Sequence, residues 1–300
     1  SRRDLLATPA ALAALASLEP PAEAATRMTL ALHQNTSSRA GYKTSLQGWA
    51  KAGIRRVEIT PNLLDQFLAT ESLAAARAVC SDNGLTVVSG AGGVNGLLES
   101  ATDRTAVMDA FKKRCGQWAE LGIPVIYLTT QSTLKPTEAD YKAAPGFVRE
   151  AAAIARQHNL TLAFEAVRNS TFIATITTML SILREANEPN AGLLFDCYHF
   201  WSGLGKMEDL DTVKPGEIKH AHFQDIPGMP RELLDSTTRV IPGDGVAPLT
   251  TILQKLSAKG YAGPLSVELF LPVFTTADPA TVAAEIKTKA EAVMRKAGVL

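Results

Sequence analysis

Short apolar runs alternate along the chain with longer stretches in which apolar residues recur about every 3.6 positions. Short runs rich in β-branched and aromatic residues are typical of buried strands, and the 3.6-residue period is typical of helices that pack on one face. The short runs predict strands over residues 28–33, 55–60, 85–90, 124–130, 160–165, 191–196, 218–224 and 263–270. The periodic stretches predict helices over residues 43–53, 73–84, 102–122, 140–159, 175–187, 206–213, 247–260 and 278–298, and residues 198–205 read as a loop.

This alternation of strands and helices predicts the fold class. Strand–helix units in regular succession, without linker-like segments between them, indicate one parallel α/β domain. Eight such units favour closure into a barrel over an open sheet, and a barrel of this kind typically has about 250 residues. We therefore predict a single (β/α)8 TIM barrel, which forms the catalytic domain over residues 26–300.

The first twenty-five residues have a different pattern. Arg2 and Arg3 precede the apolar segment ATPAALAALASL, and an A-x-A-like sequence follows at residues 22–24. Paired arginines ahead of a modestly hydrophobic segment predict a twin-arginine export signal over residues 1–25. The mature protein is then expected to be periplasmic or otherwise extracytoplasmic. The alternative is an Ala/Leu-rich helix packed on the barrel of a cytoplasmic protein.

Composition and charge exclude several classes of partner. Lys+Arg and Asp+Glu both total 30, so the chain lacks the basic excess expected of a protein that binds nucleic acid. No apolar stretch reaches the ~20 residues of a membrane-spanning helix, and we predict no membrane span. The three cysteines are scattered and form neither a disulfide framework nor a thiolate zinc site.

Four of the predicted strands end in a residue that can bind a metal ion. These residues are Glu165 in LTLAFE, Asp196 in AGLLFD, His222 in IKHAH and Glu268 in GPLSVE. The carboxyl ends of barrel strands converge on one rim, so the four side chains are expected to meet there. Oxygen ligands with one imidazole and no thiolate predict one divalent metal ion. Mn²⁺ is the first expectation, with Mg²⁺, Co²⁺ or Zn²⁺ as alternatives.

The two glutamates point to proton transfer. If Glu165 and Glu268 lie on opposite sides of a substrate, one can remove a carbon-bound proton while the other delivers one. A metal ion that polarises the neighbouring carbonyl would stabilise the enediolate between these steps. This chemistry predicts an isomerase or epimerase of a small sugar or keto-sugar. A dehydratase or lyase acting on a keto-sugar or inosose is the alternative, because the same enediolate can eliminate a β-hydroxyl group.

The chain resembles the xylose-isomerase-like TIM barrels over about residues 28–298. The resemblance rests on GIRRVEIT, LTLAFEAVRN, AGLLFDCYHF, IKHAHFQD and YAGPLSVELF. It implies the same four metal ligands and a small-molecule sugar substrate, with both glutamates as the acid/base pair. It also implies that His199 contacts a substrate oxygen, that Arg231 reaches the substrate, and that the chain could form a homo-oligomer. DCYHF and HFQDIPGMPRE are most similar to the hydroxypyruvate-isomerase branch, from which the longer loop ELLDSTTRVIPGDG departs.

Further residues near the predicted strand ends are candidates for the site. Glu58 is predicted to bind substrate or to form a structural ion pair with an arginine. His33 is predicted to line the pocket, or else to be a core histidine. His220 faces the interior together with His222 and is interpreted as a packing residue or as a residue that supports the metal ligands from behind, not as a ligand. Asp225 is predicted to orient His222 through its second ring nitrogen.

Two other classes of protein agree less well with the sequence than an isomerase does. Endonuclease IV barrels hold three metal ions and need many more histidines than the five present here. A non-catalytic periplasmic sugar-binding protein would agree with an export signal. Such proteins normally have two lobes around a hinge, and they do not need two glutamates beside an Asp/His pair.

Overall fold

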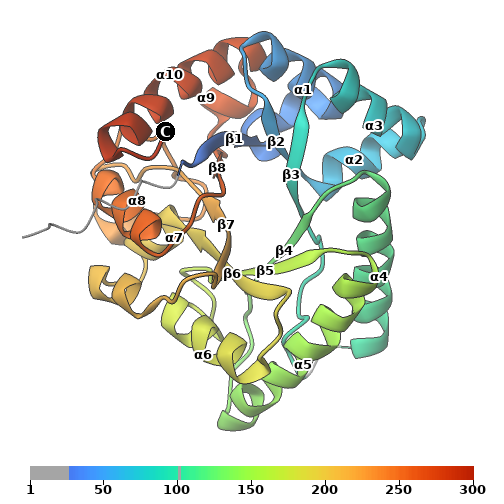
Figure 1. Ribbon diagram of the computed structural model, residues 1–300, viewed down its shortest axis with the longest axis vertical. Coiled ribbons are helices and arrows are strands. Elements are labelled where there is room, and N and C mark those ends of the chain that lie inside the picture. The colour runs from blue at the N-terminus through green and yellow to red at the C-terminus, as the bar shows by residue number, and fades with distance from the viewer. Residues whose placement is uncertain (1–26, 101–102) are drawn as a thin grey trace, which may run out of the picture.

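Eight parallel strands close into a barrel inside a ring of helices (Figure 1). The computed structural model describes residues 27–100 and 103–300, so the predicted export signal lies outside the described residues. Each strand pairs with the next along the chain, and β8 closes the barrel by pairing with β1. The strands are β1 (Thr29–His33), β2 (Arg56–Ile59), β3 (Thr86–Ala91), β4 (Val125–Thr129), β5 (Thr161–Glu165), β6 (Ala191–Asp196), β7 (Ile218–His222) and β8 (Pro264–Val267). The predicted (β/α)8 fold is confirmed.

The helices pack around the outside of the barrel. The α-helices are α1 (Gly41–Lys51), α2 (Pro61–Leu68), α3 (Leu73–Asp82), α4 (Arg104–Glu120), α5 (Glu138–Gln157), α6 (Ile176–Ala186), α7 (Cys197–Ser202), α8 (Leu249–Ala258), α9 (Pro272–Thr275) and α10 (Pro279–Ala297). The loops of the described chain contain the 3-10 helices η1 (Gln34–Ala40), η2 (Met207–Thr212) and η3 (Arg231–Leu233). Among the described residues, no helix is long and apolar enough to cross a membrane.

The segment after β6 differs from the prediction. Residues 198–205 read as a loop, but α7 begins directly after the strand, and the helix predicted over 206–213 is the 3-10 helix η2. The physical reason is a cap: Asp196 Oδ1 accepts a hydrogen bond of 2.6 Å from the backbone N–H of His199. A carboxylate in this position satisfies an N–H group that has no partner within the helix. Because of this cap, α7 begins in a segment whose aromatic residues show no helical period.

The main hydrophobic core lies between the strands and the helices. Trp49 on α1 and both Phe111 and Trp118 on α4 are completely buried. Burying an aromatic side chain of this kind contributes roughly 1.5–3 kcal/mol. Gly90 on β3 lies so close to Trp118 that a Cβ atom there would meet the indole ring at 2.7 Å. Only glycine permits this contact between α4 and the strands.

The interior of the barrel is unusually polar. Tyr127, Ala163 and Leu194 form a small apolar cluster there, whereas barrel interiors are usually filled by Val, Ile and Leu. Strand side chains alternate between the two faces of a sheet, and in-register neighbours share a face. The register pairs His33 with Glu58, and Asp196 with His222. The buried polar side chains of the strands are His33, Glu58, Ser89, Glu165, Asp196, His220, His222 and Ser266.

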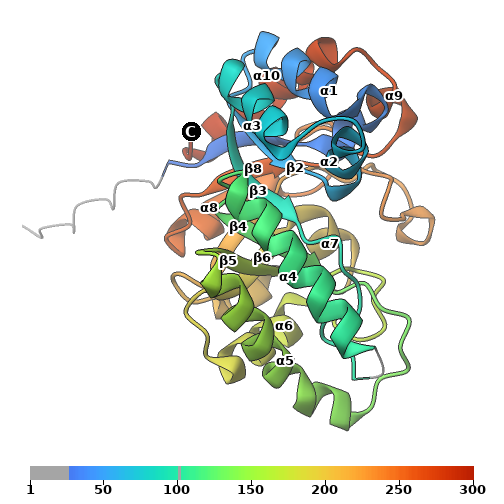
Figure 2. The ribbon, with the colours of Figure 1, turned by 90° about the vertical axis from the view of Figure 1, so that its right-hand side faces the viewer.

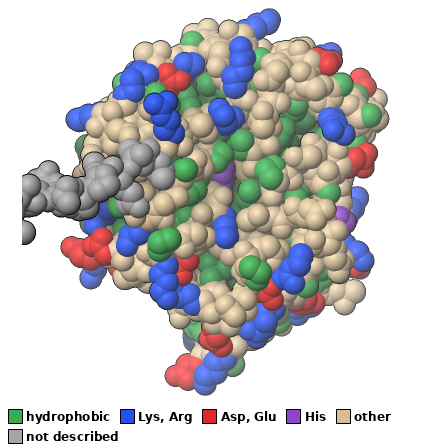
Figure 3. Space-filling view, viewed as in Figure 1, with side chains coloured by type: hydrophobic (Ala, Val, Ile, Leu, Met, Phe, Trp, Pro, Cys, Tyr) green, Lys and Arg blue, Asp and Glu red, His purple; other side chains and the backbone are tan. Residues whose placement is uncertain are grey.

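The two ends of the barrel differ. Figure 2 shows the loop between β7 and α8 projecting from the side of the barrel opposite the C-terminus. Figure 3 shows the face on which the C-terminus lies, where Lys and Arg side chains are scattered among hydrophobic and acidic ones without forming one basic patch. Because the projecting loop follows the carboxyl end of β7, it belongs to the rim formed by the carboxyl ends of the strands. Barrel enzymes carry their sites at this rim.

Candidate metal centre

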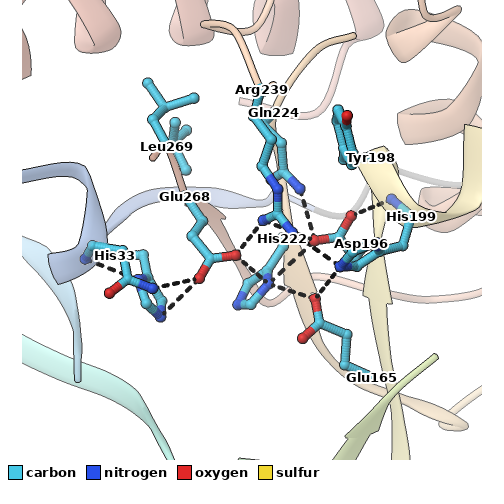
Figure 4. A network of polar contacts seen from close by, with 12 residues as sticks. His33, Glu165, Asp196, Tyr198, His199, His222, Gln224, Arg239, Glu268 and Leu269 are labelled. Atoms are coloured by element: carbon cyan, nitrogen blue, oxygen red, sulfur yellow. Dashed lines mark hydrogen bonds and ion pairs between the residues drawn. The ribbon is translucent and has the colours of Figure 1, made fainter. Parts of the chain in front are cut away.

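The structure brings the four predicted metal ligands together at this rim. Glu165 ends β5, Asp196 ends β6, His222 ends β7, and Glu268 directly follows β8. One ligand atom from each residue lies within 4.8 Å of those of the other three. All four side chains are buried, and Figure 4 shows the three carboxylates directed at one edge of the His222 ring. Metal binding stays a prediction, and the chemistry of the donor atoms shows whether these residues suit an ion.

One nitrogen of His222 faces all three carboxylates. Its Nδ1 lies 3.1 Å from Glu165 Oε1, 3.4 Å from Asp196 Oδ2 and 3.6 Å from Glu268 Oε2. Three carboxylates in a buried space repel one another unless a cation or protons compensate the charge. Three oxygen donors and one imidazole nitrogen match the preferences of divalent ions such as Mn²⁺ and Zn²⁺. The residues present therefore fit a divalent cation.

The environment drives the pKa values of the two glutamates apart. Burial raises the pKa of Glu165 to about 8, assisted by the charges of Asp196 and Glu268 and opposed by His222. Burial would also raise the pKa of Glu268, but His33, Arg239 and His222 outweigh it and lower the pKa. At neutral pH and without a metal ion, Glu165 is therefore mostly protonated and Glu268 is ionised.

The pKa values of the other two ligands follow the same competition between burial and charge. Burial opposes ionisation of Asp196, but Arg239 and His199 bring its pKa well below the usual value. Burial would lower the pKa of His222, but Glu58, Glu165 and Glu268 raise it well above the usual value. A bound metal ion would replace the proton that these acidic neighbours keep on His222, because ligands bind metal in their deprotonated form.

Arg239 lies beside the ligands, a position that no sequence pattern indicated. Its guanidinium forms an ion pair with Glu268, lies 3.4 Å from Asp196 Oδ2 and donates to His199 Nε2 at 2.9 Å. The side chain is only 2% exposed. Its carbon Cζ lies 5.2 Å from the ring centre of Tyr198 and 4.9 Å from that of Phe270. Arg239 thus places a permanent positive charge next to two of the candidate ligands.

The prediction for Asp225 is wrong. Both ring nitrogens of His222 face other groups, Nδ1 towards the candidate ligands and Nε2 towards Glu58 Oε1 at 3.0 Å. Asp225 instead accepts backbone N–H bonds of 2.8–3.1 Å from Ile226, Gly243, Gly245 and Ala247. Strand alternation explains the difference, since residues 220, 222 and 224 point inward and residue 225 does not. Asp225 holds the long loop after β7.

This loop explains the position of Arg239. The backbones of Asp225 and Val240 exchange two hydrogen bonds of 2.9 and 3.1 Å, which turn the loop back over the barrel. Arg239 precedes Val240 and is thereby carried to the rim. A contact between residues fifteen positions apart in a loop leaves no periodic signal, which is why the sequence did not reveal it.

Arg231, which the family resemblance places at the substrate, is exposed. Its Nη1 donates to the carbonyl of Gly203 at 3.1 Å, and its guanidinium lies 5.9 Å from the ring centre of Trp201. Among the described residues, no hydrogen bond or ion pair joins Arg231 to a candidate ligand. The arginine that contacts the ligands is Arg239.

His199 and Gln224 complete the surroundings of Asp196. Burial and the charge of Arg239 lower the pKa of His199 to about 4 despite the opposing effect of Asp196, so the ring is neutral at physiological pH. Gln224 donates to Asp196 Oδ2 at 2.7 Å, and its own buried Oε1 has no partner in the part of the chain that the structure describes. Gln224 was missed, although it continues the inward series of residues 220 and 222. The predicted contact of His199 with substrate stays a prediction.

The two further side chains predicted to bind substrate are not open to the rim. His33 and Glu58 are completely buried. His33 Nε2 lies 2.8 Å from the hydroxyl of Tyr127 and 3.4 Å from both Glu268 Oε1 and Glu58 Oε1. The ion-pair alternative for Glu58 was also incomplete, because its partners are histidines and not an arginine. His220, interpreted as a packing residue or as a support behind the ligands, contacts Glu58 Oε2 through Nε2 at 2.7 Å.

Fold and site together define a (β/α)8 barrel with a carboxylate–imidazole cluster at the carboxyl ends of strands β5 to β8. The sequence matches the profile of the xylose isomerase-like TIM barrel family over residues 46–292. The chain therefore belongs to this family.

Several characterised proteins are similar to the chain. The inosose isomerase of Halalkalibacterium halodurans is 27% identical over 172 residues, which cover 56% of this chain and 61% of that protein. The 3-dehydroshikimate dehydratase of Pseudomonas putida is 24% identical over 236 residues, covering 77% of this chain and 36% of that protein. The chain thus spans less than two thirds of the length of these relatives.

Solved structures show the same fold. The crystal structure of the IolI protein with a bound zinc atom superposes with a TM-score of 0.84 at 22% identity, covering 90% of this chain and 99% of that one. A structure of D-psicose 3-epimerase in the presence of D-fructose gives a TM-score of 0.73 at 18% identity, covering 90% and 100%. At these identities the likeness concerns the fold.

Proposed function

We propose that the protein is a divalent-metal-dependent isomerase or epimerase of a small sugar or keto-sugar. The observation that carries this proposal is the position of two glutamates around one imidazole nitrogen. Figure 4 shows Glu165 and Glu268 on two sides of His222, each directing an oxygen at Nδ1. Paired carboxyl groups facing a common space can remove and return a proton on different sides of a bound molecule.

The metal-free protein already separates the two glutamates in basicity. Burial raises the pKa of Glu165 to about 8, whereas His33, Arg239 and His222 lower the pKa of Glu268. With a cation bound both carboxylates would be ionised, and either could accept a proton from carbon and return it. Arg239 and the amide of Asn35, which donates to Glu268 Oε1 at 2.9 Å, hold the carboxylate of Glu268 in place. These contacts fix the candidate base before substrate enters.

Glu165, Asp196, His222 and Glu268 would hold the metal ion. When bound, a divalent cation supplies positive charge that polarises a carbonyl oxygen and favours loss of the neighbouring carbon-bound proton. Of the chain's own groups, Arg239 could then orient the substrate through its N–H donors, and neutral His199 holds Arg239 by accepting one of them at Nε2. Burial of all these side chains excludes water and strengthens their electrostatic effect.

The similar proteins support this class of reaction. An inosose isomerase and a D-psicose 3-epimerase are named for rearrangements of polyhydroxy ketones, and IolI carries zinc. A metal ion and an acid/base pair would serve the same type of rearrangement here.

A dehydratase is the second candidate. The similarity to 3-dehydroshikimate dehydratase covers 77% of this chain, more than the similarity to the inosose isomerase does. Removal of a proton beside a carbonyl followed by loss of a β-hydroxyl group would need the same residues. The position of the leaving group in the substrate would decide between the two outcomes.

Deuterium exchange tests the proposal. Protein loaded with Mn²⁺, Co²⁺, Mg²⁺ or Zn²⁺ is incubated in D₂O with a panel of ketoses, inososes and cyclic β-hydroxy ketones, and the products are followed by NMR and mass spectrometry. An isomerase or epimerase incorporates deuterium and keeps the water, whereas a dehydratase product lacks the mass of one water. Glu165→Gln and Glu268→Gln should each slow the reaction by about 10²–10⁴-fold. The surface variant Glu285→Gln on α10 is the control, and absence of exchange with every metal and substrate would refute the proposal.

A further inference from the structure

Below the metal centre lies a fully buried carboxylate that the proposed reaction does not use. Glu58 on β2 is completely buried and lies among three histidines. Its Oε1 lies 3.0 Å from His222 Nε2 and 3.4 Å from His33 Nε2, and its Oε2 lies 2.7 Å from His220 Nε2. Burying a carboxylate is costly unless it is paired, so this arrangement requires an explanation.

The two nitrogens of His222 have different surroundings. Nδ1 faces the oxygens of Glu165, Asp196 and Glu268 at 3.1–3.6 Å, and Nε2 faces Glu58. A neutral imidazole carries its proton on only one nitrogen, and the other presents a lone pair. To bind a cation through Nδ1, His222 must keep its proton on Nε2. A carboxylate that accepts a hydrogen bond at Nε2 stabilises this tautomer.

The second oxygen of Glu58 is held in turn. His220 Nε2 contacts Oε2 at 2.7 Å and the hydroxyl of Ser89 at 3.0 Å, and His220 Nδ1 has no hydrogen-bond partner within residues 27–100 and 103–300. Both carboxylate oxygens are thus occupied, and neither can reach a substrate at the rim. The chain of contacts runs from Ser89 through His220 and Glu58 to His222.

We propose that Glu58 is a positioning residue of the metal centre. It selects the tautomer of His222 that is protonated at Nε2 and fixes the ring, so that Nδ1 is the nitrogen that binds the cation. His220 and Ser89 support Glu58 in this role. The proposal rests on the proposed metal centre but adds a residue that neither ligates the ion nor contacts substrate.

A competing explanation is a second metal site. Ligand atoms of His33, Glu58 and His222 also lie within 4.8 Å of one another. An ion there would bind His222 through Nε2 and leave no proton on either ring nitrogen when the first site is filled. A histidine ordinarily binds one metal ion as a neutral imidazole. The N–H on its other ring nitrogen then needs an acceptor, and Glu58 provides it.

The test combines metal affinity with NMR of the histidine rings. The full-length protein is titrated with Zn²⁺ by competition against a chelator, and the ring nitrogens of His222 are observed by ¹⁵N NMR. We expect one ion per chain, Nδ1 bound to zinc and a protonated Nε2 in a strong hydrogen bond. Glu58→Gln, which keeps the size of the side chain, should weaken Zn²⁺ binding by about 10–100-fold and shift the Nε2–H resonance. Ser89→Ala should shift the same resonance in the same direction, but less.

The outcomes separate the two proposals. If the protein binds no divalent cation, both the metal centre and the role of Glu58 are refuted. If it binds zinc through Nε2, or binds two ions, the role of Glu58 alone is refuted, and this result needs only the wild-type protein. Unchanged affinity in folded Glu58→Gln would also overturn the inference. Glu285→Gln is the control, because Glu285 is an exposed carboxylate on α10 whose ion-pair partner is Lys289 and not a group of the barrel interior.

Discussion

Replacing Arg239 with glutamine removes a buried positive charge that contacts two candidate metal ligands. The guanidinium pairs with Glu268, lies 3.4 Å from Asp196 and donates to His199. Its pKa is raised because Asp196, Glu268 and Glu165 together outweigh the effect of burial, so the charge is present at every practical pH. Without it, the metal-free protein must keep Glu268 and Asp196 buried without this partner.

The size of the effect follows from this burial. Removing one partner of a buried ion pair costs about 3–5 kcal/mol. For a domain of this length, each kcal/mol lowers the melting temperature by about 2 °C. We therefore expect Arg239→Gln to lower the Tm of the metal-free protein by about 6–10 °C, measured by thermal unfolding in the presence of EDTA. Added Zn²⁺ should raise the Tm of Arg239→Gln by more than it raises the Tm of the wild type. The reason is that a bound cation compensates the same carboxylates that Arg239 compensates.

A surface variant provides the comparison. Arg295 on α10 pairs with Glu291 at 3.3 Å, and its side chain is 57% exposed. Exposed helix pairs contribute little, so Arg295→Gln should change the Tm by no more than about 1 °C. If Arg239→Gln were as stable as Arg295→Gln without metal, or if Zn²⁺ stabilised both to the same extent, the placement of Arg239 among the ligands would be refuted.

Three further predictions follow from the buried groups. Burial raises the pKa of Glu165 from 4.5 to about 8, so its contribution to the stability of the metal-free fold is present below pH 4.5 and is lost as the pH rises through about 8. Metal binding at pH 7 should accordingly release protons, and the affinity for the metal should increase as the pH rises. Calorimetry in buffers of different ionisation enthalpy measures the number of protons released, and a value of zero would contradict the raised pKa. Asp225→Ala should destabilise the protein by about 3 kcal/mol or more, since buried N–H groups lose a charged acceptor; hydrogen exchange should quicken at Gly243, Gly245 and Ala247, and native rates there would count against the assigned contacts. Burial raises the pKa of Cys80, Cys115 and Cys197, so a thiol reagent should label them only after unfolding; rapid labelling of the native protein would show that burial is wrong.

The strands and the four candidate ligands could be predicted because each leaves a local signal. A buried strand is an apolar run, and a polar residue at its end is visible in the sequence. The parallel topology then brings Glu165, Asp196, His222 and Glu268 to one rim whatever the detailed packing. Gln224 could have been found by the same alternation, since it is the next inward residue after His222.

The partners of these residues could not be predicted in the same way. Arg239 reaches the site only because the backbones of Asp225 and Val240 pair within a long loop, and loop conformations depend on contacts that have no period. Glu58 was recognised as a strand-end residue, but its role depends on β7, which contacts it from a distant part of the sequence. Contacts across the barrel interior are set by the stagger of the closed sheet, which the sequence pattern does not encode.

Anomalous scattering from crystals grown with Mn²⁺ or Zn²⁺ tests the central claim most directly. We predict one peak, surrounded by oxygens of Glu165, Asp196 and Glu268 and by Nδ1 of His222. A peak between His33 and Glu58, or no peak at the rim in a crystal that contains the metal at saturating concentration, would contradict the assignment of this cluster as the metal centre.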